Sequence, residues 1–233
     1  MDTADRLAHV RERIDAAARR AGRDPAGVRL VAVGKQFPVE RLRDIVRAGH
    51  RRLGENRVQE AESKAADLAA AVEWHLIGHL QGNKARRAAR IFDWVHTVDS
   101  LAVARRLAAG AREAGRSINL LVQVDLAGTR ERSGVPPEDL CALLSDLARE
   151  VALPLRGLMT LPPRTPTAEG ARPHFRHLAA LARSAADEGL LPPHPDLSMG
   201  MSADYEIAVE EGATLVRVGS GIFGARPAPP VNG

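Results

Sequence analysis

Short apolar runs alternate with longer amphipathic segments along almost the whole chain. Eight runs of five to nine residues are rich in Val, Leu and Ile and are bounded by Gly, Pro or charged residues, a pattern that predicts buried strands. We expect these strands at 28–34, 51–55, 73–79, 93–99, 118–126, 155–161, 196–201 and 214–220. Apolar residues at spacings of three and four predict helices between them. The expected helices lie near 3–22, after Pro38, and at 56–70, 83–92, 100–115, 137–151, 168–189, 203–212 and 221–226.

Alternating strands and helices indicate a parallel sheet. Eight such units in 233 residues favour a single closed (β/α)8 TIM barrel with an extra N-terminal helix. The rival is an open doubly wound sheet, which carries a G-x-G-x-x-G turn after its first strand. The turn at 33–38 reads VGKQFP and lacks that motif. Because no linker divides the chain, we expect one domain at 1–226 and a disordered tail at 227–233.

The composition is that of a cytoplasmic protein with a large core. With 45% hydrophobic residues, the chain can bury its core without disulfides or a metal. The single cysteine, Cys141, lies in an apolar helical pattern and is expected to be a small buried hydrophobe. The N-terminus is charged throughout and lacks the apolar segment of a signal peptide. No apolar run reaches the roughly 20 residues of a membrane helix, so no membrane partner is expected.

The net positive charge of the chain does not indicate a nucleic-acid partner. The net charge is +4, but aromatic residues make up only 3%, which leaves little to stack on bases. The arginines are also interleaved with acidic residues or spaced along helices, as expected for solvated helix faces.

Only three of the 33 basic residues are lysines: Lys35, Lys64 and Lys84. A chain that otherwise uses arginine keeps lysine where an amine must be able to lose its proton. Lys35 fits this reasoning best, since it ends the first predicted strand, where TIM barrels carry their chemistry. Lys64 lies in a polar helix and is expected on the surface. Lys84 is either a surface residue or a second amine near the site.

The ends of the seventh and eighth strands have the composition of a phosphate site. Ser202, Gly219 and Ser220 stand in the two loops that bind phosphate in TIM barrels, beside a helix N-terminus. Ser202 has an alternative role as the N-cap of the helix that follows. In a closed barrel the first and eighth strands are neighbours, so Lys35 would face these loops.

An amine opposite a phosphate site indicates either pyridoxal 5'-phosphate (PLP) or a Schiff-base sugar phosphate. Arg217 is the charged residue on the eighth strand and would face the pyridine nitrogen of PLP. Its alternative is a salt bridge to a nearby acid. His75 and His79 flank the third strand without a further ligand at metal-binding spacing, and we expect structural roles for both.

Several motifs resemble the pyridoxal phosphate homeostasis protein family, which is similar to the N-terminal barrel of alanine racemase. The matching stretches are VAVGKQFP, GENRVQEA, WHLIGHLQGNK, VHTVDS, RSGV, RGLMTL and LSMGMSADYEIAVEEGATLVRVGSGIFGAR. The resemblance implies PLP bound as an internal aldimine on Lys35, in a monomer that buffers the cofactor or delivers it to apo-enzymes and catalyses no known reaction. The cofactor-binding residues that it implies are Lys35, Asn56, Met199, Ser202, Arg217, Gly219 and Ser220.

The sequence also departs from the family pattern. Gly34 and Gln36 stand where Ser and Thr are common, Ser220 where Thr is usual, and Arg132 where a lysine often precedes Ser-Gly. Because an arginine forms no Schiff base, Arg132 argues against a relay role for that loop.

The alternative function is a PLP-dependent amino-acid racemase with weak activity. Racemisation needs a base on each face of the α-carbon, and in alanine racemase the second base is a tyrosine of a C-terminal domain. The chain ends at the eighth strand, and its single tyrosine, Tyr205, does not match that position. A Schiff-base aldolase is also disfavoured, because it would place its lysine on a later strand and no acid–base pair is evident here.

Overall fold

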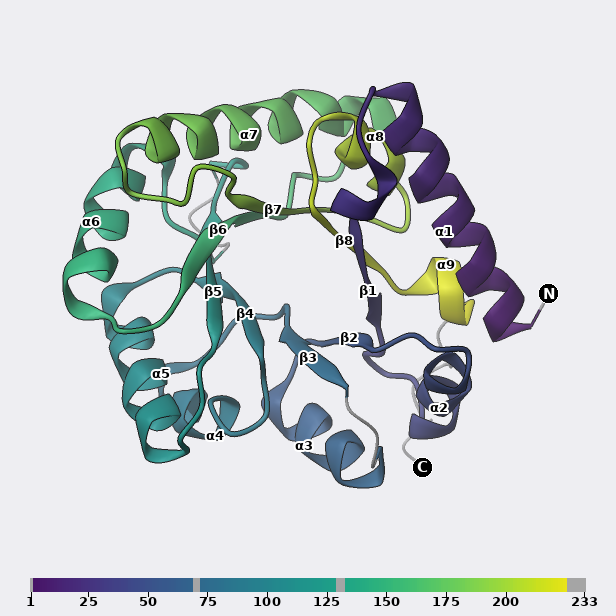
Figure 1. Ribbon diagram of the computed structural model, residues 1–233, viewed down its shortest axis with the longest axis horizontal. Helices are drawn as coiled ribbons and strands as arrows, with labels where there is room; N and C mark the ends of the chain where they lie inside the picture. The colour runs from purple at the N-terminus through teal and green to yellow at the C-terminus, as the bar shows by residue number, and fades with distance from the viewer. Residues whose placement is uncertain (1, 69–71, 129–132, 226–233) are drawn as a thin grey trace.

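Eight parallel strands form a closed barrel in the computed structural model of the chain, which describes residues 2–68, 72–128 and 133–225. The strands hydrogen-bond in sequence order, and β1 pairs with β8 to close the ring (Figure 1). The TIM-barrel prediction is therefore confirmed. The predicted tail and Arg132 lie outside the described residues. The strands are β1 (Arg29–Val33), β2 (Arg52–Glu55), β3 (Glu73–Leu76), β4 (Trp94–Val98), β5 (Asn119–Val124), β6 (Leu155–Thr160), β7 (Asp196–Met201) and β8 (Leu215–Val218).

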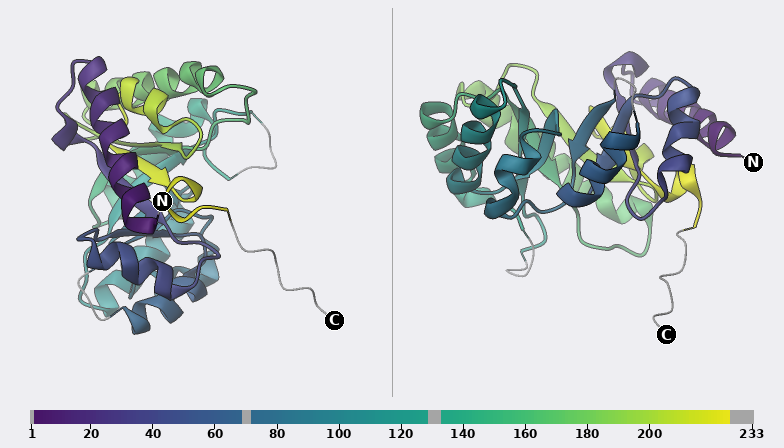
Figure 2. Two further views of the ribbon diagram at one scale, coloured as in Figure 1. Left: turned by 90° about the vertical axis from the view of Figure 1, so that its right-hand side faces the viewer. Right: turned by 90° about the horizontal axis from the view of Figure 1, so that it is seen from below.

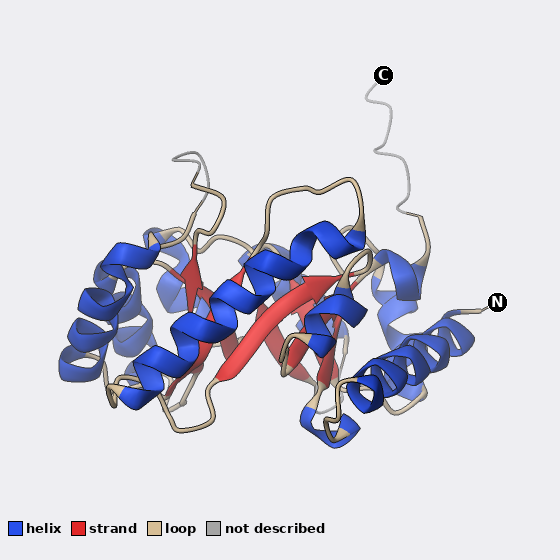
Figure 3. Cartoon of the chain, turned by 90° about the horizontal axis from the view of Figure 1, so that it is seen from above, coloured by secondary structure: helices blue, strands red, loops and turns tan. Residues whose placement is uncertain are grey.

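Helices surround the barrel (Figures 1 and 3). They are α1 (Thr3–Arg20), α2 (Val39–Arg47), α3 (Val58–Asp67), α4 (Ala85–Ala88), α5 (Leu101–Glu113), α6 (Leu140–Glu150), α7 (Arg172–Asp187), α8 (Tyr205–Glu210) and α9 (Ser220–Phe223). Several are shorter than predicted, and the difference is clear at α4, which follows a 3-10 turn at Gly82–Lys84, at α8, which begins only at Tyr205, and at α9, which has four residues. Within the described ranges, no helix combines the length and apolar character that a membrane crossing requires.

The N-terminal helix α1 covers the seam where β8 meets β1. The helix after β8, α9, has only four residues, and α1 packs against α9, α8 and α2 (Figure 2). One face of α1 is buried, with Leu7, Val10 and Ile14 each at most 3% exposed. Beyond its end, the Arg23 guanidinium donates to the Ala213 carbonyl at 2.9 Å. The first segment of the chain thus takes the place of a full eighth helix.

The core has two parts. The larger lies between the strands and the helices, and a smaller cluster of Val31, Trp94, Leu121, Met159 and Leu215 is separate from it. Because side chains alternate along a strand, β4 and β8 each contribute to both parts.

The interior of the barrel is closed at the amino-terminal ends of the strands. The Trp94 ring stacks on His75 with centroids 5.8 Å apart, and the Arg29 guanidinium lies 5.0 Å from the centre of the Trp94 ring. Arg29 also forms an ion pair with Asp196. A ligand can therefore approach the interior from the carboxyl ends, where the βα loops lie.

The prediction for Cys141 is wrong, because its side chain is exposed. In α6 the buried positions are Leu140, Leu144 and Leu147. Cys141 follows Leu140 by one residue, which turns it by about 100° around the helix and away from the buried face.

Candidate functional site

The candidate site is built from the ends of four neighbouring strands: β2, β1, β8 and β7. Lys35 follows β1, whose Ala32 pairs with Val218 of β8 and whose Val33 pairs with Gly54 of β2. Lys35 is half-buried. The predicted adjacency of Lys35 and the loop after β8 is confirmed by this register.

A tight turn fixes the backbone around Lys35. The Phe37 amide donates to the Gly34 carbonyl at 3.0 Å, and Gln36 has a φ of +64°, which costs a residue with a Cβ about 1 kcal/mol or more. A Cβ at Gly34 would lie 2.8 Å from Glu55 Oε1 and 2.9 Å from Leu42 Cδ2. Close packing favours glycine at this departure from the family pattern, because a Cβ at position 34 would require the ends of the Glu55 and Leu42 side chains to shift.

Lys64 is buried, and the prediction that it lies on the surface is wrong. Its side chain is 9% exposed, and Nζ donates to the Gly34 carbonyl at 2.8 Å, to Glu55 Oε1 at 2.8 Å and to Glu60 Oε1 at 2.7 Å. Glu60 Oε1 also accepts from the Gln36 amide at 2.6 Å. Lys64 therefore ties the two residues that flank Lys35 to β2 and α3. We call Lys64, Glu55 and Glu60 the lysine clamp.

Glu55 is the titratable member of the clamp. Its side chain has no exposed surface, and burial raises its pKa to about 7, against the opposing charges of Lys64 and Lys35. Its Oε2 atom has no hydrogen-bond partner among the described residues. A carboxyl that changes charge near neutral pH thus lies beneath the Lys35 turn.

Ser202 connects the loops after β7 and β8. Its Oγ accepts from the Gly219 amide at 3.2 Å and from the Gly221 amide at 3.3 Å. Its alternative role as an N-cap is wrong, because α8 begins at Tyr205 and its N-cap residue is Asp204. Both amide protons are directed at Ser202 Oγ, and the hydroxyl can turn its own proton outward. Ser220 is exposed next to them.

Arg217 is buried inside the barrel, with only 3% of its surface exposed. Its Nη1 donates to Ser198 Oγ at 2.5 Å and its Nη2 to the Thr160 carbonyl at 2.9 Å. Burial lowers its pKa to about 10. The alternative of a salt bridge is wrong for the described part of the chain, where Arg217 forms no ion pair. A buried guanidinium of this kind can still bind an acceptor supplied by a ligand.

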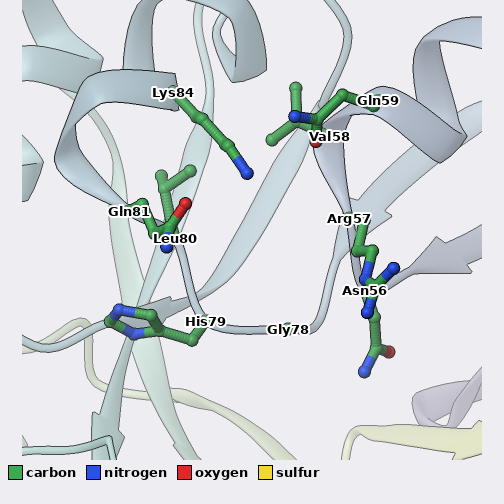
Figure 4. A pocket seen from close by; sticks show the side chains of 9 residues that line it. All are labelled: Asn56, Arg57, Val58, Gln59, Gly78, His79, Leu80, Gln81 and Lys84. Atoms are coloured by element: carbon green, nitrogen blue, oxygen red, sulfur yellow. The ribbon is translucent and has the colours of Figure 1, made fainter.

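Asn56 opens onto a cavity of about 530 Å³ at the ends of β2 and β3 (Figure 4). Its Oδ1 is buried without a partner in the described chain. Lys84, Arg57 and His79 also line the cavity, and no carboxylate of the described residues does. The Lys84 side chain has no hydrogen-bond or ion-pair partner among the described residues. Of the predicted cofactor-binding residues, Asn56 lines this cavity with Lys84, whereas Lys35, Arg217 and Ser202 do not.

The two histidines predicted to flank the third strand, His75 in β3 and His79 after it, differ in position. His75 is fully buried in the barrel and hydrogen-bonded, whereas His79 is exposed at the mouth with its Nδ1 2.9 Å from Ser133 Oγ. The prediction of structural roles is consistent with these contacts. No potential metal cluster of His, Cys, Asp or Glu occurs in the described ranges.

Met199 is fully buried in the larger core cluster, so its side chain points away from the other predicted site residues. Sequence reasoning missed the site's supporting residues, Lys64, Ser198 and His96. A signal existed for Lys64, because Val58, Ala61 and Lys64 recur at a spacing of three and share the buried face of α3.

Fold and site together define a class of protein: a single (β/α)8 barrel with a lysine after the first strand and a donor-rich loop after the eighth. The family model of the alanine racemase N-terminal domain matches residues 6–227. A pyridoxal phosphate homeostasis protein of Pseudomonas aeruginosa is 46% identical over 96% of this chain and 95% of its own length. The chain belongs to the pyridoxal phosphate homeostasis protein family.

Solved structures agree with this assignment. PipY of Synechococcus elongatus, solved with PLP bound, has a TM-score of 0.84 and 41% identity, covering 96% of this chain and 100% of PipY. Alanine racemase of Corynebacterium glutamicum has a TM-score of 0.67 at 21% identity, and the match covers 98% of this chain but 63% of the racemase. The second likeness shows the barrel fold alone.

Proposed function

We propose that this chain binds PLP covalently on Lys35 and holds it for buffering or delivery without catalysing a reaction. The observation that carries the proposal is the convergence of three chemistries on three adjacent strands, β7, β8 and β1. An amine follows β1, a guanidinium lies on β8, and the Ser202 hydroxyl joins the loops after β7 and β8. These match the aldehyde, the pyridine nitrogen and the phosphate of the cofactor.

The phosphate would be held by Ser202, Gly219 and Ser220. Gly219 is packed closely, since a Cβ there would lie 3.3 Å from the Val33 carbonyl, so the backbone can approach a ligand without a side chain in between. The unpartnered Oδ1 of Asn56 is an acceptor for a group near the ring. Met199 would contribute only through its backbone.

Arg217 supports a carrier more than an enzyme. PLP catalyses by drawing electrons into its ring, and a protonated pyridine nitrogen strengthens this effect. A guanidinium can only donate a hydrogen bond, so Arg217 would keep that nitrogen unprotonated. A racemase also needs a base on each side of its substrate. Tyr205 is 5% exposed and its pKa is raised by burial, which does not suit that role.

Borohydride reduction and mass spectrometry test the attachment. The aldehyde and the Lys35 amine condense with loss of water, and borohydride converts the C=N bond to a stable secondary amine. We expect one pyridoxyl-phosphate adduct on the peptide that contains Lys35, absent from Lys35→Ala and retained in Lys84→Ala. An adduct on Lys84 would show that PLP is attached there and not on Lys35. The absence of any adduct in the presence of excess PLP would refute covalent binding of PLP by a lysine.

Delivery is tested by mixing the loaded protein with an apo-enzyme that needs PLP. We expect the apo-enzyme to gain activity faster than with the same total concentration of free cofactor. Equal rates would reduce the role to storage. We also propose that the protein acts as a monomer, which sedimentation equilibrium of the loaded protein would check.

A further inference from the structure

A continuous chain of hydrogen bonds crosses the interior of the barrel and ends at Arg217. Glu73 Oε1 lies 2.8 Å from His75 Nε2, and His75 Nδ1 lies 2.9 Å from His96 Nε2. His96 Nδ1 lies 2.8 Å from Ser198 Oγ, which accepts from Arg217 Nη1 at 2.5 Å. The chain starts at the first residue of β3, near the closed end of the barrel, and passes through β4 and β7 to β8. We call it the interior chain.

The chemistry of the two ends fixes the direction of every bond in the interior chain. Arg217 can only donate, and an ionised Glu73 can only accept. A neutral imidazole donates from one nitrogen and accepts at the other. Glu73 therefore accepts a hydrogen bond from the N–H of His75 Nε2, and His75 Nδ1 accepts one from the N–H of His96 Nε2. His96 Nδ1 is left as the acceptor for the Ser198 hydroxyl.

The surroundings keep both imidazoles neutral. His75 and His96 have no exposed surface. Burial lowers the pKa of each imidazole. At His75 the hydrogen bond and charge of Glu73 oppose this effect without overcoming it, whereas at His96 the nearby charges of Arg217 and Arg29 act in the same direction as burial. The hydrogen bond from His75 lowers the pKa of Glu73. A single arrangement of protons is thus stable from one end to the other.

We propose that Glu73, His75, His96 and Ser198 are positioning residues that set the orientation of Arg217 at the PLP site. With the Ser198 proton committed to His96, only oxygen lone pairs face Arg217. If His96 instead carried its proton on Nδ1, Ser198 would lose that acceptor, and its hydroxyl proton could turn toward the guanidinium. A break at Glu73, at the far end of the interior chain, would therefore loosen Arg217. This inference rests on the proposed role of Arg217 opposite the pyridine nitrogen.

The proton arrangement can be read directly in the protein without cofactor. Long-range 1H–15N correlation spectra of 15N-labelled protein distinguish the two neutral tautomers of each histidine. We expect His75 and His96 both to carry the proton on Nε2 and to be neutral at pH 8, above the ordinary pKa of an imidazole. A proton on Nδ1 of His96, or a charged imidazole at this pH, would overturn the proposed arrangement of protons.

The consequence for PLP is tested with Glu73→Ala, Glu73→Gln and Glu62→Ala. Glu62 is a matched control, because its side chain is 32% exposed against 35% for Glu73, and each pairs with an arginine: Glu62 with Arg87, and Glu73 with Arg52, whose Nε lies 3.5 Å from Glu73 Oε1. We expect Glu73→Ala to weaken PLP binding about tenfold and to shift the absorption maximum of the bound cofactor. Glu73→Gln keeps an acceptor and should bind within about twofold of the parent, as should Glu62→Ala.

The outcomes separate this inference from the proposed function. Parent-like affinity and spectrum in Glu73→Ala would overturn the positioning role, as would equal losses in Glu73→Ala and Glu73→Gln, which would indicate a role for charge alone. If Glu73→Ala does not fold, Ser198→Ala, which breaks the chain next to Arg217, takes its place. The absence of a Lys35 adduct in the parent would refute the proposed function, whereas the histidine tautomers are measured independently of it.

Discussion

Replacing Lys64 by methionine tests the lysine clamp. The substitution keeps most of the side-chain volume but removes the ammonium group that bonds Gly34, Glu55 and Glu60. Removing one partner of a buried ion pair costs about 3–5 kcal/mol, because the other charge remains buried without compensation. We expect a loss of this size in the free energy of unfolding at pH 9.

The loss should be smaller at low pH, because Glu55 can take up a proton. The pKa of Glu55 in the folded protein is about 7, above its ordinary value of 4.5, so the folded state binds more protons between these values and stability falls as pH rises through them. Without Lys64 the pKa of Glu55 rises further, and the fall continues above pH 7. We therefore expect a loss of only about 2 kcal/mol at pH 6, from the missing hydrogen bonds.

Urea unfolding of the cofactor-free protein at pH 6, 7.5 and 9 measures these differences. Lys84→Met is the control and should change the free energy of unfolding by less than about 0.5 kcal/mol. The double variant Lys64→Met with Glu55→Gln removes both charges and should recover most of the loss at pH 9. If Lys64→Met matched Lys84→Met at pH 6 and pH 9, the clamp would have no energetic role.

Three further predictions concern single residues. Burial, followed by the charge of Arg11, lowers the pKa of His50 from 6.5 to about 4, so the unfolded state binds the extra proton and stability falls by about 3 kcal/mol as pH drops from 6.5 to 4. In His50→Gln, the free energy of unfolding from urea titrations should no longer show this decrease between pH 6.5 and pH 4. An unchanged dependence of that free energy on pH would contradict the role of His50. Ser202→Ala should raise the dissociation constant for PLP about fivefold, equivalent to about 1 kcal/mol for a lost hydrogen-bonding group. Equal dissociation constants for the variant and the parent in fluorescence titrations would refute a role of Ser202 in binding the phosphate. Ellman's reagent should titrate Cys141 in the native protein, and Cys141→Ser should change stability by less than about 0.5 kcal/mol.

The sequence predicted the fold because the strands are largely buried on both faces, and several of them, such as β1 and β5, appear as nearly continuous apolar runs. The strand ends of the site followed from barrel topology, which brings Lys35, Arg217 and Gly219 to neighbouring positions whatever the helix lengths. Helix boundaries were less predictable, as α4 and α8 show, because short segments carry too little periodicity to fix their ends.

The supporting residues could not be predicted in the same way. Lys64 shares a face with Val58 and Ala61, but its polar neighbours indicated a solvated helix. The contact between His75 and His96, and that between His96 and Ser198, depend on the relative positions of strands far apart in the sequence. No local pattern encodes that relation, so these contacts required the structure.

The position of α1 has a consequence for synthesis of the protein on the ribosome. This helix emerges before the strands of the barrel, yet the elements that pack against it include α8 and α9, about 200 residues later in the chain. At roughly 5–20 residues per second, the apolar face of α1 waits on the order of 10–40 s for those partners. During that interval the nascent chain presents a surface suited to chaperones, and the barrel can close only after its last strand has left the exit tunnel.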